Sequence, residues 1–337
     1  MTEKQYGGSS KFGAKSKVVS NTKTQVKEIN NKSSSNADNS DSDFNIEKII
    51  QAGKIASQVK IFAREFIKPG LSLLEIAEKI ESQISKLGGK PAFPVSLSIN
   101  EVAAHSTPSF NDTSVASGLL KVDLGVSISG FISDTAFSVD LENSEENKSL
   151  INAAETALKN AVECIALNIS LNEIGKTIDK TSQSLGFLPI RNLSGHSISK
   201  YELHAGITIP NFASGSTQKI PSGLYAIEPF TTLSSGSALV RDGKPSGIYH
   251  LENASGVRDS FAREVLDFIV EEYNTLPFCS RWIYKKFGSR GLLALRQIEQ
   301  SGCLHHYKQL VETSGSKVAQ AEQTVLLTEK DKIITTL

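Results

Sequence analysis

Residues 121–141, KVDLGVSISGFISDTAFSVDL, predict a β-hairpin that carries acidic residues in both strands. Val, Ile, Phe and Leu dominate this stretch, and such residues favour strands. Ser129–Gly130 supplies turn residues at its middle. Asp123 and Asp134 interrupt the apolar pattern, although burying a carboxylate without a partner is costly. The stretch therefore predicts a core hairpin in which two carboxylates need an explanation.

The length of the turn decides where the two aspartates point. A two- or four-residue loop centred on Ser129–Gly130 pairs Asp123 with Ala136 and Asp134 with Gly125. Both carboxylates then lie on one face, about 7–8 Å apart at their backbones, and their mutual repulsion would favour binding of a divalent metal. A three-residue loop would place them on opposite faces. One aspartate facing solvent on a half-exposed hairpin is the other interpretation.

A repeated segment predicts that the chain folds as two similar halves. LSLLEIAEKIESQISKLG begins at Leu71, and ISLNEIGKTIDKTSQSLG begins at Ile169, an offset of 98 residues. Each has Ser at its second position and Glu three residues later, which is the pattern of a capping box at a helix start. The repeat indicates two α+β halves, each made of two helices followed by strands, with a site where their sheets meet.

The composition is that of a globular protein with a sizeable core. The chain has 337 residues, 39% of them hydrophobic, and its formal net charge is zero. This charge balance favours neither a specific nucleic acid nor a membrane as partner. Three widely spaced cysteines indicate neither a disulfide framework nor a thiolate zinc site. With no apolar run of about 18 residues and no signal-peptide pattern, we expect a cytoplasmic protein, and a monomer.

Residues 1–44 differ from the rest of the sequence. They are rich in Ser, Asn and Lys and lack apolar periodicity, which predicts a disordered N-terminal extension ahead of a catalytic domain at 45–337. The first 32 residues hold seven Lys and two Glu. Such a charge could give a weak contact with RNA, including the ribosome, but the composition favours a solvated tail.

Further candidate metal ligands lie in three later segments that we expect to form strands. His196 and His204 belong to NLSGHSISKYELHAGITIPN, Glu228 to LYAIEPFTT and Glu322 to VAQAEQTVLL. Taken singly, each is more often an ordinary polar residue. Together with the hairpin aspartates, the glutamates bring four negative charges, enough to balance two divalent cations, and His196 would add a neutral nitrogen ligand.

These segments together resemble the type 2 methionine aminopeptidases, particularly their short archaeal form, over roughly residues 45–337. The resemblance is carried by KPAFPVSLSINEVAAHSTP, the D-x10-D hairpin, NLSGHSISKYELHAGITIPN, AIEPF, TLPFCSRW and VAQAEQTVLL. It implies the two-half pita-bread fold and removal of the initiator methionine from nascent polypeptide N-termini when the second residue is small. It also implies two divalent metal ions, which could be Co²⁺, Mn²⁺, Fe²⁺, Zn²⁺ or Ni²⁺ with a hydroxide between them.

The resemblance assigns a role to each matching residue. The implied metal ligands are Asp123, Asp134, His196, Glu228 and Glu322. Asp134 and Glu322 would bridge the ions, His196 and Glu228 would bind one ion, and Asp123 would bind the other. Glu228 would also move the proton, with His105 and His204 as further catalytic and substrate-binding residues. The implied methionine pocket comprises Phe93, Leu203 and Tyr307, with core packing as the alternative for Leu203.

Residues 255–316 correspond to the helical insertion that distinguishes the type 2 enzymes. Taken alone, GLLALRQIEQSGCL with the nearby Lys285, Lys286 and Arg290 could be a winged-helix DNA-binding element. We favour the insertion, because a strand bearing Glu322 must follow it to complete the site.

The sequence departs from the family pattern beside this last glutamate, and two other functions on the same fold remain open. Ala321 and Gln323 replace the usual Phe and His, a change that could alter metal affinity or rate. A prolidase-like metallopeptidase would share the five ligands, but LHAGITIPN and the insertion favour the methionine enzyme. A non-catalytic pita-bread binding protein would typically lack ligands, and none is missing here.

Overall fold

Two helices precede the first sheet of the described structure. The computed structural model describes residues 45–337, so the predicted extension at 1–44 lies outside the described residues. Helix α2, Ile46–Phe66, begins where the Asn45 side chain accepts a hydrogen bond from the backbone of Lys48. Helix α3, Leu73–Lys86, begins at Ser72. The Ser72 hydroxyl accepts from the Glu75 backbone, as the capping box predicts.

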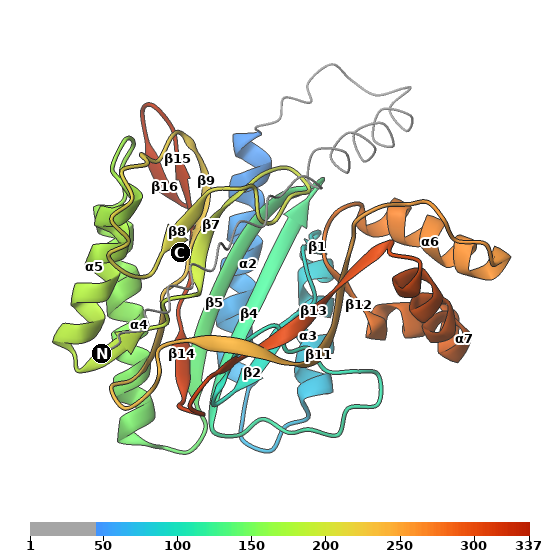
Figure 1. The fold of residues 1–337 in the computed structure, drawn as a ribbon, viewed down its shortest axis with the longest axis horizontal. Helices are drawn as coiled ribbons and strands as arrows, with labels where there is room; N and C mark the ends of the chain where they lie inside the picture. The colour runs from blue at the N-terminus through green and yellow to red at the C-terminus, as the bar shows by residue number, and fades with distance from the viewer. Residues whose placement is uncertain (1–44) are drawn as a thin grey trace, which may run out of the picture. The chain divides into compact units, whose positions relative to one another are not determined.

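The second pair of helices repeats this arrangement and confirms the predicted halves. Helix α4, Glu145–Cys164, is capped by Ser144, and helix α5, Leu171–Ser184, is capped by Ser170. The helices α3 and α5 have equal lengths of 14 residues and start 98 residues apart. Figure 1 shows α2 and α3 behind the sheet of the first half and α4 and α5 beside the second half.

The hairpin that opened the sequence analysis forms the centre of the first sheet. This sheet runs β1–β4–β2, and β5 also pairs with β4, along the whole length of that strand. Its strands are β1 Lys90–Pro91, β2 Ser96–Ile99, β4 Leu119–Ile128 and β5 Phe131–Asp140. Asp123 pairs with Ala136 and Gly125 with Asp134, so the predicted register is confirmed. Ser129 and Gly130 both have positive φ, 53° and 88°, as a two-residue hairpin turn requires.

The second half contributes two sheets. The larger one runs β16–β15–β9–β7–β8, and the smaller one runs β14–β10–β6. The larger sheet comprises β7 Ser194–Ile198, β8 Thr208–Pro210, β9 Gly223–Ile227, β15 Gln323–Leu327 and β16 Lys332–Ile334. The smaller sheet comprises β6 Phe187–Pro189, β10 Phe230–Leu233 and β14 Val318–Gln320. The chain passes directly between these sheets three times, from β6 to β7, from β9 to β10 and from β14 to β15.

A fourth sheet joins the region of the predicted insertion to the first half. It runs β12–β11–β13–β3 and comprises β3 Val102–Ala104, β11 Val240–Leu251, β12 Phe278–Cys279 and β13 Leu304–Glu312. Helices α6, Ser260–Tyr273, and α7, Ser280–Gln300, cover one end of it. Residues 255–316 are mostly helical, as expected, through α6 and α7. The strand β13 near the end of this region was not expected, because its residues pair with β11 and β3, partners distant in the sequence.

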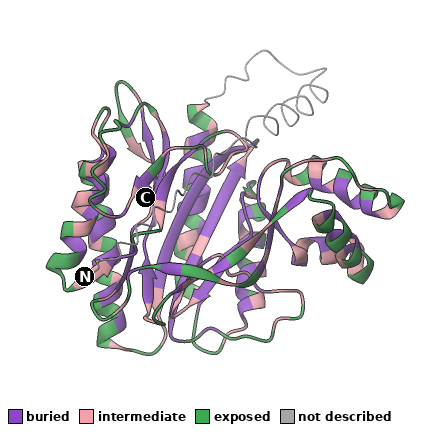
Figure 2. Cartoon of the chain, in the orientation of Figure 1, coloured by how far each residue is buried: buried purple, intermediate pink, exposed green. Residues whose placement is uncertain are grey.

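Burial follows this layered arrangement. The central strands β4 and β5 are largely buried, whereas α6 and α7 carry many exposed residues (Figure 2). Helices α2 and α3 pack against the first sheet through one apolar cluster, and α4 and α5 pack against the second half through another. Among the described residues, no helix is long and apolar enough to cross a membrane.

A buried ion pair joins the helical region to the first half. Arg281 at the start of α7 binds Glu81 of α3 through two nitrogen–oxygen contacts of 2.7 Å. Trp282 Nε1 and the backbone of Val95 also donate to the Glu81 carboxylate, and Arg281 Nε donates to the carbonyl of Pro108. This bidentate geometry satisfies both charges away from water. It therefore attaches the start of α7 to α3.

We predict that Glu81→Ala lowers the free energy of unfolding by about 3–5 kcal/mol, because it leaves the Arg281 charge buried and unpaired. The double variant Glu81→Leu/Arg281→Met should lose much less than the sum of its single variants. Denaturant unfolding of Glu81→Ala tests the first expectation, and unfolding of the unchanged chain, Glu81→Leu, Arg281→Met and the double variant measures the coupling. Strictly additive losses would contradict the assignment of a specific pair.

Candidate metal centre

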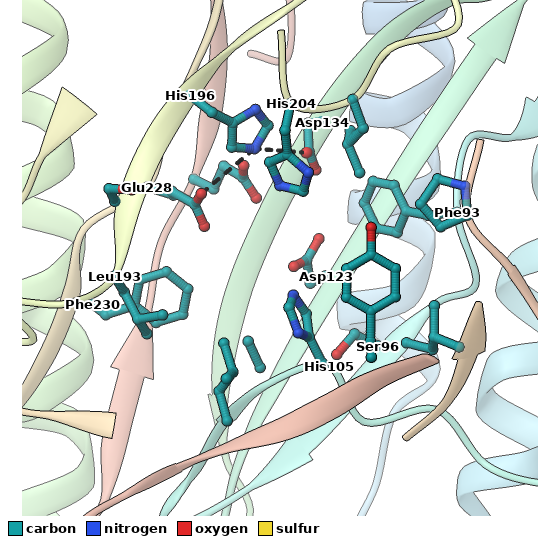
Figure 3. A pocket seen from close by; sticks show the side chains of 18 of the residues that line it. Phe93, Ser96, His105, Asp123, Asp134, Leu193, His196, His204, Glu228 and Phe230 are labelled. Atoms are coloured by element: carbon teal, nitrogen blue, oxygen red, sulfur yellow. Dashed lines mark ion pairs between the residues drawn. The ribbon is translucent and has the colours of Figure 1, made fainter. Parts of the chain in front are cut away.

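All ten site residues predicted from the sequence line one cavity of about 310 Å³. They are Phe93, His105, Asp123, Asp134, His196, Leu203, His204, Glu228, Tyr307 and Glu322. Figure 3 shows Asp134, Glu228 and His196 converging at one side of the cavity, with Asp123 between them and His105. The structure therefore brings the predicted residues together, although they come from segments spread over more than 200 residues.

The acidic residues are positioned by two different features of the fold. Asp123 and Asp134 lie inside the paired strands β4 and β5. Glu228 and Glu322 were expected inside strands, but both lie outside them. Glu228 follows the end of β9 at Ile227, and Glu322 lies between β14 and β15. Both glutamates thus occur where the chain changes sheets. At these breaks the backbone leaves the ladder, which lets a side chain turn toward the cavity.

His196 lies in β7 and faces the acidic residues. Its Nε2 is 3.7 Å from Asp134 Oδ2 and 3.5 Å from Glu228 Oε1. Asp134, His196 and Glu322 each offer a ligand atom, and these atoms lie within 4.8 Å of one another. Asp123 and Glu228 line the same cavity beside this group.

The hydrogen-bond inventory shows that these residues fit a metal site. Buried oxygens of Asp123, Asp134 and Glu322 have no hydrogen-bond partner within the described part of the chain. Buried polar atoms are nearly always satisfied, so several orphaned carboxylate oxygens around one cavity indicate a missing partner. Oxygen donors with one imidazole nitrogen form a donor set that suits divalent first-row ions.

Burial raises the pKa of every carboxyl in the cluster, and repulsion between carboxylates adds to this for Asp134, Glu228 and Glu322. Burial raises the pKa of Asp123 to about 7. Burial, followed by the charge of Asp123, raises the pKa of Asp134 well above its ordinary value. The pKa values of Glu228 and Glu322 are raised in the same way, by burial and then by the neighbouring carboxylates. A bound divalent cation would favour the charged forms and so reverse these shifts.

The two remaining cavity histidines lie on irregular backbone. His105 follows β3 and has a positive φ of 58°, and its Nδ1 is 3.3 Å from the carbonyl of Lys308. Its ring meets Tyr307 edge-on at 5.2 Å, and burial lowers its pKa to about 4. His204, expected amid strand residues, lies instead on the loop between β7 and β8, with its ring 4.3 Å from that of His196. The loop lets His204 approach His196 from outside the sheet.

Phe93 occupies space that Gly125 leaves free. A Cβ built on Gly125 would lie 2.3 Å from Phe93 Cε1. Gly125 pairs with Asp134 and leaves room beside this carboxylate, because it has no side chain. The Phe93 ring, which lines the cavity, occupies that room.

Gln320 is a functional candidate that the sequence reasoning missed. Its side-chain amide donates to Asp123 Oδ2 and to Glu228 Oε2, each at 3.4 Å. A signal was present, because a residue two positions before Glu322 in an extended segment faces the same side. Neither neighbour of Glu322 faces the cavity in this way. Ala321 is buried in the apolar core of the second half, and Gln323 pairs with Ile227 in the β15–β9 ladder.

Comparison with known proteins agrees with this geometry. The model of metallopeptidase family M24 matches residues 47–272. The methionine aminopeptidase of Methanocaldococcus jannaschii is 45% identical over 293 residues, which cover 86% of this chain and 98% of that protein. The chain belongs to metallopeptidase family M24. Within this family it groups with the archaeal methionine aminopeptidases.

Solved structures show the same fold at low sequence identity. The methionine aminopeptidase of Thermotoga maritima is similar with a TM-score of 0.63 and 23% identity, over 88% of this chain and 98% of that one. The structure of a thermophilic Arx1 is similar with a TM-score of 0.74 and 14% identity, over 87% of this chain and 91% of that one. These likenesses concern the fold alone, which is the pita-bread fold of the M24 aminopeptidases.

We predict that Gly125→Ala destabilises the protein by about 1–3 kcal/mol, because the added methyl group must displace the Phe93 ring. The second variant, Gly125→Ala/Phe93→Leu, should recover part of this loss, since Leu vacates the position that the methyl group needs. Thermal unfolding of both variants and of Phe93→Leu alone gives the coupling energy. Losses that add without coupling would show that the two residues do not compete for space.

Proposed function

We propose that this protein removes the N-terminal methionine from nascent polypeptides whose second residue is small, with two divalent metal ions in the cavity. The observation that supports this most strongly is the cluster of orphaned carboxylate oxygens beside His196, in a chain that belongs to the M24 metallopeptidases. Two relatives that the chain covers over 98% and 99% of their own length are methionine aminopeptidases.

Five residues around the cavity would hold the two ions: Asp123, Asp134, His196, Glu228 and Glu322. When bound, such a pair of ions supplies an activated water at neutral pH and polarises the scissile carbonyl. Glu228 is suited to hold a proton, because it lines the cavity and burial raises its pKa well above its ordinary value. It would receive the proton of the attacking water and deliver it to the leaving amine.

The other proposed roles use side chains on the cavity wall. His105 and His204 would donate hydrogen bonds to the substrate and to the oxyanion that develops on the scissile carbonyl. With its lowered pKa, His105 is neutral near pH 7 and adds no charge beside a positively charged substrate amine. Phe93, Leu203 and Tyr307 would enclose the methionine side chain, which is flexible and apolar.

Peptide hydrolysis tests this function. With added Mn²⁺ or Co²⁺, the purified protein should release Met from Met-Ala-Ser but not from Met-Lys peptides, and chelation should abolish release. Glu228→Gln should lower kcat by about 10²–10⁴-fold, because an amide cannot accept the proton. Glu264→Gln, an exposed change on α6, serves as control and should leave kcat unchanged. Absence of Met release with every divalent ion tried would refute the proposal.

The same experiment separates the two alternatives on this fold. A prolidase-like enzyme would cleave Xaa-Pro dipeptides and leave Met-Ala-Ser intact. A non-catalytic binding protein would cleave neither, but that role leaves the orphaned ligand cluster without a purpose.

A ribosome contact through residues 1–44 is a finer part of the proposal, and it would place the enzyme in the cytoplasm beside its substrates. The seven Lys residues among the first 32 support it, since such a segment is attracted to RNA phosphates. Deletion of residues 1–44 should reduce co-sedimentation with ribosomes at low salt while Met release from peptides persists. Unchanged co-sedimentation would remove the extension from the proposal.

A further inference from the structure

The proposed metal ligands come from two halves that meet along a seam between separate sheets. Strand β5 carries Asp134 and pairs on one side with β4. Its other side faces the segment 318–327, which carries Glu322 in strands that belong to the two sheets of the second half. A backbone hydrogen bond of 3.0 Å crosses from Glu322 N–H to the carbonyl of Ala136. Figure 1 shows β14 beside β5.

Above this bond, the hydroxyl of Thr324 takes the place of a backbone partner for Asp134. Thr324 Oγ1 accepts a hydrogen bond of 2.8 Å from the Asp134 N–H and donates one of 2.7 Å to the Asp134 carbonyl. A hydroxyl has one donor and two acceptor lone pairs, so it can satisfy both groups at once. Thr324 is fully buried, and no water is needed to complete the pair.

Below the same bond, the arrangement is repeated with the roles of the halves exchanged. Ser138 of β5 accepts from the Gln320 N–H at 2.9 Å and donates to the Gln320 carbonyl at 2.8 Å. Ser138 is also buried. The backbone that it holds carries the Gln320 amide, which donates to Asp123 and to Glu228. The Thr324 hydroxyl therefore holds the backbone of Asp134, a proposed ligand. The Ser138 hydroxyl holds the backbone of Gln320, whose amide contacts two further proposed ligands.

We infer that Thr324 and Ser138 are positioning residues that set the spacing of the metal ligands across the seam. The inference rests on the proposed metal-dependent function. Because the four acidic ligands repel one another, an opening of the seam would relieve their repulsion and spread the ligands apart. The two hydroxyls oppose this opening on either side of the Glu322–Ala136 bond, where the Thr135 hydroxyl also donates to the Glu322 carbonyl at 2.9 Å. Each of the two tethers both the N–H and the carbonyl of a residue at the site.

The variant Thr324→Val tests this role, because Val keeps the shape of the Thr side chain and lacks its hydroxyl. The full chain is used for Thr324→Val, Ser138→Ala, the conservative Thr324→Ser, and the control Thr231→Val. Thr231 is buried on β10, where its backbone pairs with Ala319 of β14, but its hydroxyl donates to the carbonyl of Leu150 in α4 at 3.3 Å instead of to β5. Mn²⁺ binding is measured by calorimetry, and the separation of the two ions by the spin coupling in the electron paramagnetic resonance spectrum.

We expect Thr324→Val and Ser138→Ala to raise the Kd for Mn²⁺ by about 10–100-fold and to change the spin-coupled signal. Thr324→Ser should restore both the affinity and the signal. Thr231→Val should unfold at a lower temperature but bind Mn²⁺ as the unchanged chain does. Wild-type affinity and signal in Thr324→Val would overturn the inference, as would an equal loss in Thr231→Val. Failure of the unchanged chain to bind Mn²⁺ would instead refute the proposed function.

Discussion

The concentration of negative charge in one buried cavity is the constraint on which the rest of this structure depends. Asp123, Asp134, Glu228 and Glu322 line the same space, and burial together with mutual repulsion raises the pKa of the last three well above their ordinary values. The cation of Lys60 lowers the pKa of Glu322, but less than burial and the three other carboxylates raise it. A bound divalent cation would favour the charged forms of these carboxyls, and the fold has to hold them close together against their mutual repulsion.

The two halves share this task unequally. The first half holds its two carboxyls rigidly, because Asp123 and Asp134 lie inside a hairpin of two ten-residue strands whose pairing is continuous. The second half supplies Glu228 and Glu322 from breaks between strands, where the ladder no longer fixes the backbone. Pro229, which follows Glu228, has no N–H to continue the ladder, and its carbonyl accepts instead from the Ala321 N–H. The two breaks thus support each other, and the buried hydroxyls of Thr324 and Ser138 connect them to the hairpin.

How much of this could be predicted depends on how local the responsible interactions are. The hairpin register followed from Ser129–Gly130, and the halves followed from the repeated caps at Ser72 and Ser170, since turns and caps involve residues close in the sequence. The strand β13 was missed, because its partners lie on β11 and β3. The strand breaks at the two glutamates were missed for the same reason, whereas Gln320 was missed despite a local signal, its place two residues before Glu322. Each break depends on which sheets meet, and no single segment specifies that.

The region between α6 and β13 is more than a wall added to a complete site. Strand β13 pairs with β3, and His105 follows β3 directly, with Nδ1 near the carbonyl of Lys308 and its ring against Tyr307. The position of His105 is therefore set by residues of this region as well as by the first half. The ion pair between Arg281 and Glu81 anchors the other end of the region to α3. Loss of this ion pair would loosen the attachment of the region to α3 and so affect His105 through β13, although neither Arg281 nor Glu81 lines the cavity. The hairpin, the breaks and this region consequently form one structural unit around the cavity. The hairpin and the breaks hold the acidic residues, and β13 holds His105.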